Sequence, residues 1–356
     1  MNPAGPLNLK DLSLPELQAR LEGWGASPLA ARKIFSRVFH HGAASLAELR
    51  DAEQVTRAVR ERIQAEDVLP ALEVVERRRA ADGFVKYLFR SPLGGVFEAV
   101  RIPLFDTKYV VCLSSQVGCA LACDFCQTGK LGFSRNLQTW EIVDQLLHIR
   151  READRRVSGV VFMGMGEPLL NLDACLRAAS VIMAPAGLAI DGRKITLSTA
   201  GVVPAIHKLI DLQVPHRLAF SLTSAIAEKR GQVMPIEKTH PLPTLVDAIR
   251  RYTEVRRARA MLAYVCISGF NMGREDAQAL ARTFEGVPIQ LDLIDVTDPT
   301  GTYRPPGDDE LRAFRDHLQI LKAPIARRYS GGKDIGAACG TLAATQRGGE
   351  VLSTAG

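Results

Sequence analysis

Three closely spaced cysteines constrain this chain more than any other feature. Cys119, Cys123 and Cys126 form a C-x3-C-x2-C pattern, and Phe125 precedes the last cysteine. Thiolates are soft ligands that select zinc or iron–sulfur clusters. A structural zinc site normally requires four ligands, commonly in two C-x2-C-like pairs, and the sequence has no second pair. The spacing therefore indicates a four-iron cluster held by three cysteines, with one iron left open for another molecule.

Strand-like and helical segments alternate over most of the chain beyond residue 106. Because helices separate the strands, this pattern predicts a parallel β-sheet, either doubly wound or curled into a barrel. In such barrels, ligands sit at the C-terminal ends of the strands. The expected strands are 109–114, 159–163, 194–198, 218–222, 261–268 and 289–294, with helices between them, for example at 139–152, 172–183 and 243–256.

Polar residues follow these strands where a barrel would place its ligand. Gly166 and Glu167 follow the second strand. Glycine lets the backbone approach a ligand closely, and a glutamate accepts hydrogen bonds from an amino group. Ser198 and Ser221 end the third and fourth strands, where hydroxyls can bind a carboxylate or a ribose. The alternative is an ordinary surface turn with serines at strand ends, and three polar strand ends beside a cluster motif weigh against it.

The first third of the chain predicts a small helical domain followed by three antiparallel strands. Ser13 and Glu16 have the spacing of a capping box at the start of a first helix. A second helix follows Ser27, and a third is expected from about Leu46 to Ile63. The strands are expected at 72–78, 84–90 and 96–102.

Glu98 is the only acid on the third of these strands. An isolated acid on such a strand usually faces water or pairs with a neighbour such as Arg101. It could instead be a buried base with a raised pKa. Taken alone, the residues favour the first interpretation.

The composition is that of an ordinary globular protein with a basic surplus. Of the 356 residues, 47% are apolar and 24% charged, which is enough to bury a real core. The net charge of +6 favours an acidic partner such as nucleic acid. Seven cysteines in a chain this long do not suggest a secreted disulfide framework. No apolar run of transmembrane length, signal peptide or coiled-coil pattern is visible, so we expect a cytoplasmic monomer that does not enter a membrane.

Four other cysteines stand apart from the cluster motif. Cys175 and Cys266 lie among apolar residues and are expected in the core, and core packing is also the default for Cys112 on the first barrel strand. Cys339 is different, because the small residues around it give it no obvious packing role. We expect it on a loop that can enter the mouth of a barrel.

Together the motifs resemble the radical SAM RNA methyltransferases of the RlmN and Cfr type, where SAM is S-adenosylmethionine. The cysteine spacing, aromatic included, matches the signature of the radical SAM superfamily, and the resemblance covers nearly the whole chain. The lone cysteines Cys112 and Cys339 separate this family from other radical SAM enzymes. The segments that carry the resemblance are 112–119, 162–171 and 337–340.

The resemblance implies an α/β fold, a partial (β/α)6 radical SAM barrel with a small N-terminal helical domain and a short antiparallel β unit. The expected divisions are a helical accessory domain at 1–70 and a β linker unit at 71–105. The barrel would span 106–300, and a C-terminal segment carrying Cys339 would span 301–356.

The resemblance also implies a reaction, the methylation of an adenine ring carbon (C2 or C8) in ribosomal RNA, transfer RNA or both. Cys339 would take a methyl group from one SAM, and a second SAM would be cleaved to supply a radical. Cys112 would then resolve the protein–RNA link by forming a disulfide with Cys339. Such a covalent route splits one hard step into easier ones. Glu98 matches the family's proton acceptor, which overturns the interpretation made from the residues alone.

The same resemblance assigns the cofactors. A 4Fe–4S cluster would be reduced by a donor such as flavodoxin or ferredoxin, and two SAM molecules would be used per turnover. The residues implied are Cys119, Cys123 and Cys126 for the cluster, and Gly166, Glu167, Ser198, Ser221, Leu222 and Thr223 for SAM.

The sequence departs from the family pattern in the SAM-binding segments. Thr223 stands where the family has His, and residues 294–299 replace an expected Trp-Asn-Pro, which leaves Asp298 as the nearest candidate for the SAM-contacting Asn. The segment 234–240 differs as well. These changes spare the cysteines and Glu98, and they are typical of a divergent paralogue.

Two other hypotheses stay open. One is a radical SAM enzyme that uses the same cysteine pair on a non-RNA substrate. The other is an iron–sulfur protein that binds RNA or carries electrons without catalysis. Cleavage of SAM by the reduced protein would exclude the latter, and a dependence of that cleavage on RNA would separate the former from an RNA methyltransferase.

Overall fold

One large sheet of ten strands forms the frame of the molecule. The structure is a computed structural model and describes residues 6–344. The order of the strands is β14-β13-β12-β11-β10-β9-β6-β5-β4-β3. Strands β6 and β9 to β14 are parallel, as the alternation of strands and helices predicts. These strands are β6 (Lys108–Cys112), β9 (Arg156–Phe162), β10 (Ile195–Thr199), β11 (Arg217–Ser221), β12 (Ala260–Cys266), β13 (Ile289–Asp295) and β14 (Ile325–Arg327).

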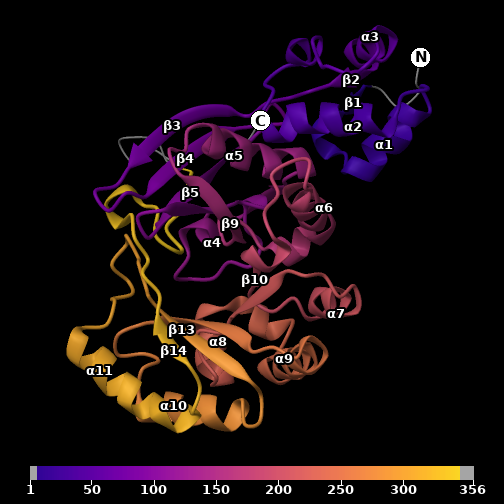
Figure 1. The fold of residues 1–356 in the computed structure, drawn as a ribbon. Coiled ribbons are helices and arrows are strands. Elements are labelled where there is room, and N and C mark those ends of the chain that lie inside the picture. Colours follow the sequence, from indigo (N-terminus) through magenta and orange to yellow (C-terminus); the bar gives the residue numbers. More distant parts are fainter. Residues whose placement is uncertain (1–5, 345–356) are drawn as a thin grey trace.

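Helices cover one side of the parallel strands (Figure 1). They are α5 (Thr139–Arg151), α6 (Leu172–Met183), α7 (Val203–Asp211), α9 (Leu242–Arg256), α10 (Arg274–Thr283) and α11 (Asp308–His317). Two shorter helices, α4 (Gln127–Lys130) and α8 (Ala227–Val233), lie in the loops after β7 and β11. The expected strands are confirmed with ends shifted by at most three residues. The three-residue β14 was not predicted, because it is too short to show a pattern.

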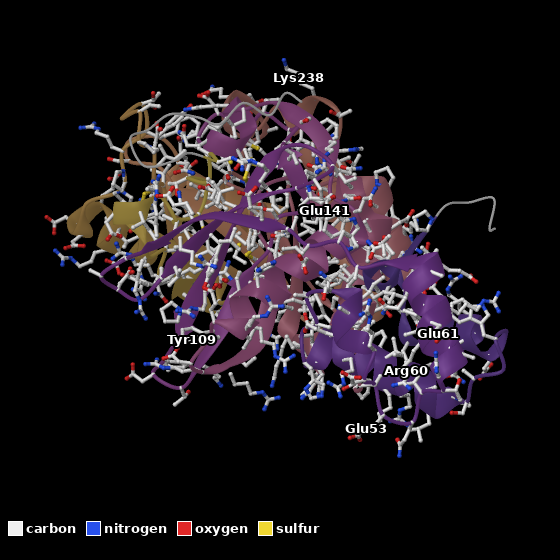
Figure 2. The ribbon with its side chains drawn as sticks, turned by 90° about the horizontal axis from the view of Figure 1, so that it is seen from above. Glu53, Arg60, Glu61, Tyr109, Glu141 and Lys238 are labelled. Carbon is white, nitrogen blue, oxygen red and sulfur yellow. The ribbon has the colours of Figure 1, made fainter. Side chains whose placement is uncertain are left out.

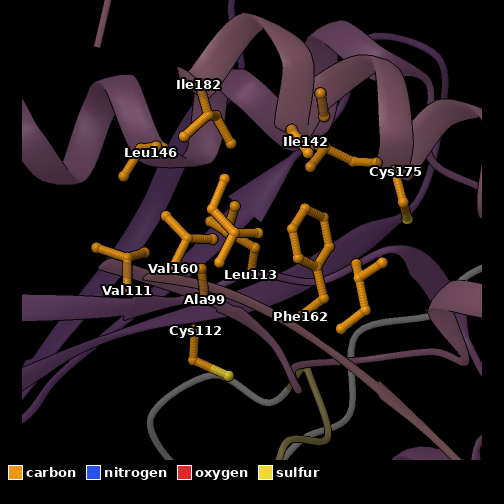
Figure 3. Packing of buried hydrophobic residues seen from close by; sticks show 14 of the residues in the cluster. Ala99, Val111, Cys112, Leu113, Ile142, Leu146, Val160, Phe162, Cys175 and Ile182 are labelled. Carbon is orange, nitrogen blue, oxygen red and sulfur yellow. The ribbon is translucent and has the colours of Figure 1, made fainter. Parts of the chain in front are cut away.

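The core lies between the strands and the helices that cover them. Val160 and Phe162 on β9 pack with Ile142 on α5 and Ile182 on α6, and all four side chains are at most 1% exposed (Figure 3). Burying a side chain of this size stabilises the fold by about 1.5 to 3 kcal/mol. Cys112 on β6 points to the opposite side of the sheet, away from these residues (Figure 3).

Three antiparallel strands extend the same sheet. They are β3 (Glu73–Arg79), β4 (Val85–Arg90) and β5 (Val96–Leu104), close to the predicted positions. The last of them, β5, pairs antiparallel with β6. The predicted strands are therefore continuous with the barrel sheet rather than a sheet of their own.

The N-terminal helices project from one side of the body and carry the half-buried Arg60 and the exposed Glu61 (Figures 1 and 2). They are α1 (Leu14–Glu22), α2 (Pro28–Phe35) and α3 (Arg57–Glu66). The predicted capping box at α1 is confirmed, because the Glu16 carboxylate accepts the backbone N–H of Ser13 at 2.8 Å and the Ser13 hydroxyl accepts that of Glu16.

The predicted helix from Leu46 to Ile63 was wrong. A 3-10 turn at Leu46–Leu49 comes first, and α3 starts only at Arg57. Gln54 adopts a left-handed φ of 60°, which interrupts a right-handed helix. Thr56 then caps α3 by accepting the backbone N–H of Val59.

A small hairpin that the sequence did not reveal holds the cysteine motif. Its strands, β7 (Gln116–Gly118) and β8 (Phe133–Asn136), pair antiparallel on either side of the motif. They are too short for a period-2 pattern to indicate them. No helix in residues 6–344 has the length and apolar character needed to cross a membrane.

Candidate active site

Backbone geometry closes the loop that carries the three cysteines. Gly118 has a φ of 74°, and the Cys119 N–H donates to the carbonyl of Gly132 at 2.8 Å. A Cβ atom on Gly118 would lie 1.9 Å from that same carbonyl oxygen. Glycine is therefore required at this position, both for the left-handed backbone and for the close approach of the two strands.

The three thiols line one cavity, which we call the cysteine cavity. It has a volume of about 180 Å³ and lies at the C-terminal ends of the parallel strands. Gly129, beside the last cysteine, packs so closely that a Cβ atom there would lie 3.0 Å from the backbone of Cys123. The residues that the sequence had singled out and that line this cavity are Cys119, Cys123, Cys126, Gly166, Glu167, Ser198, Ser221 and Cys339.

The chemistry of these donors suits an iron–sulfur cluster. Burial raises the pKa of Cys119 to about 12 and also raises that of Cys123 and Cys126, so the unliganded thiols hold their protons. Iron ions would displace those protons on binding. In residues 6–344 no three Cys, His, Asp or Glu side chains are arranged to hold a single metal ion. A 4Fe–4S cluster binds each cysteine through a different iron atom, so it does not need the three sulfur atoms to converge on one point.

Glu167 lines the same cavity as the cysteines and is buried. Its carboxylate accepts the backbone N–H groups of Leu169 at 3.1 Å and Ala200 at 2.9 Å. Burial outweighs these hydrogen bonds and raises the pKa of Glu167 to about 7. Gly166, directly before Glu167, has a left-handed φ of 97°. A Cβ atom on Gly166 would lie 2.5 Å from the side chain of Gln116. A ligand ammonium or amino group would stabilise the ionised carboxylate.

The segment after β11 contributes Ser221 to the cavity but not the two residues that follow it. Leu222 and Thr223 are completely buried and do not line the cysteine cavity. Thr223 has a φ of 60°, and its carbonyl accepts a hydrogen bond from Asn271 at 2.7 Å. The two residues are thus placed to support the cavity wall.

Asp298 does not line the cysteine cavity, and its role as the replacement for the family's Asn stays a prediction. Its carboxylate accepts hydrogen bonds from Thr300 and from the Tyr303 N–H, and it lies 3.8 Å from the Lys130 ammonium. Asp295 and Thr297 line the cavity instead. The buried Asp295 Oδ1 and Thr297 Oγ1 have no hydrogen-bond partner in the described chain. Their position at the C-terminal end of β13 was the signal in the sequence that could have identified them.

Cys339 lies on a loop at the mouth of the barrel, as expected, and is exposed. The loop is anchored to the cysteine motif, because the Gln127 N–H donates to the Gly340 carbonyl at 2.8 Å and the Thr128 hydroxyl donates to the Leu342 carbonyl at 2.6 Å. The Cys339 N–H donates to Ser330 Oγ at 2.9 Å. These contacts hold Cys339 beside the three cysteines.

Cys112 and Cys339 also line a second cavity of about 670 Å³, which we call the large cavity. It lies between β5, the parallel strands from β6 to β12 and the segment 328–342. Cys112 is buried, and burial above all raises its pKa to about 12, with the charge of Cys339 adding to the rise and that of Arg328 opposing it. The fold therefore brings together two cysteines that are 227 positions apart in the sequence.

Glu98 is neither exposed nor paired with Arg101. Its carboxylate lies 2.9 Å from the Lys86 ammonium and accepts the backbone N–H of Ala343 at 2.9 Å. Arg101 instead lies over the ring of Tyr109. Three residues apart on a strand, Glu98 and Arg101 point to opposite faces, and this explains why the pairing expected from the residues alone was wrong. In this conformation Glu98 is covered by the C-terminal segment and lines neither cavity.

A parallel sheet, a three-cysteine loop at its C-terminal end and a buried glutamate in the same cavity are the features of the radical SAM class. The model of the radical SAM superfamily matches residues 113–284. The crystal structure of a radical SAM methyltransferase from Sphaerobacter thermophilus superposes with a TM-score of 0.88. It is 34% identical and covers 96% of this chain and 100% of its own. The predicted fold, a partial barrel with N-terminal helices, is thereby confirmed.

The names of similar proteins identify the family within the radical SAM class. A "Probable RNA methyltransferase" of Myxococcus xanthus is 68% identical, with 97% of both chains covered. A "Dual-specificity RNA methyltransferase RlmN" of Syntrophobacter fumaroxidans is 40% identical over 95% of this chain and 98% of its own. The chain belongs to the family of radical SAM RNA methyltransferases of the RlmN type.

Proposed function

We propose that this protein methylates an adenine ring carbon, C2 or C8, in ribosomal RNA, transfer RNA or both, through a methyl group carried on Cys339. The observation that carries the proposal is the position of Cys339. It lines both the cysteine cavity and the large cavity, and Cys112 lines the second of these. A carrier thiol must meet the methyl donor and then a resolving thiol, and this position serves both needs. The names of the relatives support RNA as the substrate.

Each residue has a role in this scheme that its surroundings support. Cys119, Cys123 and Cys126 would hold the cluster, and Gly166, Glu167, Ser198 and Ser221 would bind SAM, with Leu222 and Thr223 behind them. When bound, the cluster and two SAM molecules supply the methyl group and the radical that activates it. Asp295 and Thr297 would satisfy their free polar atoms on SAM, because a buried oxygen without a partner costs about 1 to 3 kcal/mol.

The resolving step falls to Cys112. Its sulfur would attack the Cys339 sulfur, so that an S–S bond forms and the C–S bond to the substrate breaks. Because the attacker is a thiolate, a pKa of about 12 keeps Cys112 inactive until the substrate complex lowers that pKa or removes the proton.

Glu98 would accept the proton that the adenine carbon loses. The Ala343 N–H now occupies one of its carboxylate oxygens and Lys86 the other. We therefore expect the segment around Ala343 to move aside when RNA binds, leaving Glu98 paired with Lys86. The electron donor is proposed to be a flavodoxin or ferredoxin, and the protein a cytoplasmic monomer.

The test follows the methyl group. The protein is reconstituted with iron and sulfide without oxygen, given SAM with an isotopically labelled methyl group, and digested for mass spectrometry. We expect the label on Cys339 in the wild type, and none in the Cys339→Ala variant, which should keep its cluster absorbance. The core cysteine variant Cys175→Ala is the matched control and should still load Cys339. An unlabelled Cys339 in protein that binds SAM and holds its cluster would contradict the proposal.

The substrate is tested next, with total RNA as the probe. Labelled methyl groups should appear on adenine carbons in RNA, and Cys112→Ala should accumulate a covalent protein–RNA adduct. Labelled Cys339 without any label in RNA would move the assignment to a non-RNA substrate.

A further inference from the structure

The lining of the large cavity has an unusual charge. Five cations line it, and no aspartate or glutamate of the described chain does. Arg193 forms an ion pair with Asp191 at 2.8 Å. The other four, Lys108, Lys194, Arg217 and Arg328, form no ion pair within residues 6–344, although Asp191 is close enough to Lys194 for their charges to interact.

Most of these cations surround one end of the barrel. Lys108 and Arg217 are the first residues of β6 and β11, and Lys194 immediately precedes β10. Lys194 and Arg217 are exposed, so the large cavity reaches solvent there. Arg217 and Ser221 are the two ends of β11, about 13 Å apart at 3.3 Å per residue. One lines the large cavity and the other the cysteine cavity. The large cavity therefore runs from the N-terminal end of the barrel to Cys112 and Cys339, where it meets the cysteine cavity.

The interior of the large cavity differs from its basic rim. Val100, Ile102, Val110 and Val161 line it, and the two cavities meet at Cys126, Met163, Arg328 and Cys339. This arrangement suits a nucleotide, whose base is apolar on its faces and whose phosphates are anionic. A volume of about 670 Å³ lies within the 300 to 1,000 Å³ typical of ligand sites.

Tyr329 adds a surface for a base. It lines the large cavity and is 72% exposed, although large aromatic side chains are normally buried. Its hydroxyl donates to Asp82 at 2.8 Å, and its ring lies edge-on to Phe84 with centroids 6.1 Å apart. A ring held in this way is ready to stack on a base, and proteins that bind single-stranded RNA use exposed aromatic rings for that purpose.

We propose that the adenosine of the RNA substrate reaches Cys339 and Cys112 through the large cavity, from the N-terminal end of the barrel, while SAM occupies the C-terminal end. Lys108, Lys194 and Arg217 hold the phosphates that flank this nucleotide, and Tyr329 stacks on a neighbouring base. This inference rests on the proposed RNA substrate. Cofactor and RNA thus enter from opposite ends and meet at Cys339, so neither has to leave for the other to bind.

Two substitutions at the rim test this route. The probe is a fluorescent ten-nucleotide oligoadenylate, whose binding to the reconstituted protein is followed by anisotropy over a range of salt concentrations. The variant Lys194→Gln/Arg217→Gln should weaken binding about tenfold at 100 mM salt. It should also reduce the slope of log Kd against log salt by about 1.4, because each lost phosphate contact on a single strand accounts for about 0.7.

A second pair of arginines serves as the matched control. Arg259 and Arg282 are also exposed, but they line a different surface cavity beside Glu285. The variant Arg259→Gln/Arg282→Gln loses the same charge and should bind as the wild type does. Equal weakening by both pairs would show that net charge alone attracts the RNA, and would overturn the proposed route. Cluster absorbance and circular dichroism verify that each variant is folded.

Protection of Cys339 tests the same proposal without any substitution. Oligoadenylate should slow the alkylation of Cys339 by iodoacetamide in the wild type, because it fills the large cavity. RNA that binds without protecting Cys339 lies elsewhere and would overturn the route, while methylation of RNA would still support the proposed function. Failure of the wild type to bind any RNA would overturn both.

Discussion

At the scale of single residues, the candidate site is built from ionisable and polar groups whose burial lowers the stability of the folded protein. Glu167 is buried with its pKa raised to about 7, and Cys112 with its pKa raised to about 12. Asp295 and Thr297, which line the cavity, each have a buried oxygen without a hydrogen-bond partner in the described chain. Such groups lower the stability of the unliganded protein, and ligand binding recovers part of that loss. Site residues can therefore be distinguished from structural ones by measuring stability.

Glu167→Gln should make the unliganded protein more stable at neutral and high pH. The pKa of Glu167 is raised from 4.5 to about 7 by folding, so the wild type loses stability as the pH rises from 4.5 to 7, when the buried carboxyl ionises. Glutamine carries no such penalty. Urea unfolding should show a gain about 2 kcal/mol larger at pH 8 than at pH 5. The same variant should bind SAM more weakly, and a gain that does not change with pH would contradict this account of Glu167.

At the scale of elements, short pieces of backbone position the chemistry. The hairpin of β7 and β8 closes the cysteine loop, and α4 anchors the Cys339 loop through Thr128. The functional groups are therefore held by main-chain hydrogen bonds near glycines rather than by large packed side chains.

Gly118→Ala should abolish cluster binding. The new methyl group would collide with the Gly132 carbonyl, 1.9 Å away, and open the hairpin. Gly132→Ala is the matched control, because Gly132 has the same φ of 74° but a Cβ atom there meets nothing within 4 Å. The control carries only the left-handed backbone cost of about 1 to 2 kcal/mol. Iron content and visible absorbance after reconstitution measure the difference, and similar losses in both variants would assign the effect to backbone strain alone.

At the scale of the whole molecule, buried polar contacts join the N-terminal part to the barrel. The Lys10 ammonium lies 2.6 Å from Asp144 on α5, and both side chains are at most 3% exposed. Asp144 also accepts the Leu72 N–H at 2.8 Å. One carboxylate thus connects the N-terminal segment, the start of the antiparallel strands and a barrel helix.

Lys10→Met should destabilise the protein by about 3 to 5 kcal/mol, because it leaves the Asp144 charge buried with too few partners. Lys208→Met breaks an exposed ion pair of similar length, 2.7 Å to Asp173, and should cost less than about 1 kcal/mol. Urea unfolding of both variants measures the contrast. Equal costs would mean that Leu72 and His148 stabilise the buried Asp144 carboxylate well enough without Lys10.

The sequence by itself determined the class of chemistry and most of the sheet. The spacing of Cys119, Cys123 and Cys126, and the alternation of strands and helices, are local patterns that depend on ligand preference and on burial of one helix face. Only the tertiary structure decided which distant groups meet. It brought Cys112 beside Cys339, placed Lys86 rather than Arg101 on Glu98, and put Asp295 and Thr297 in the lining of the cysteine cavity. Contacts between strands and loops far apart in the chain arise from packing of the whole fold. A local sequence pattern therefore cannot predict them.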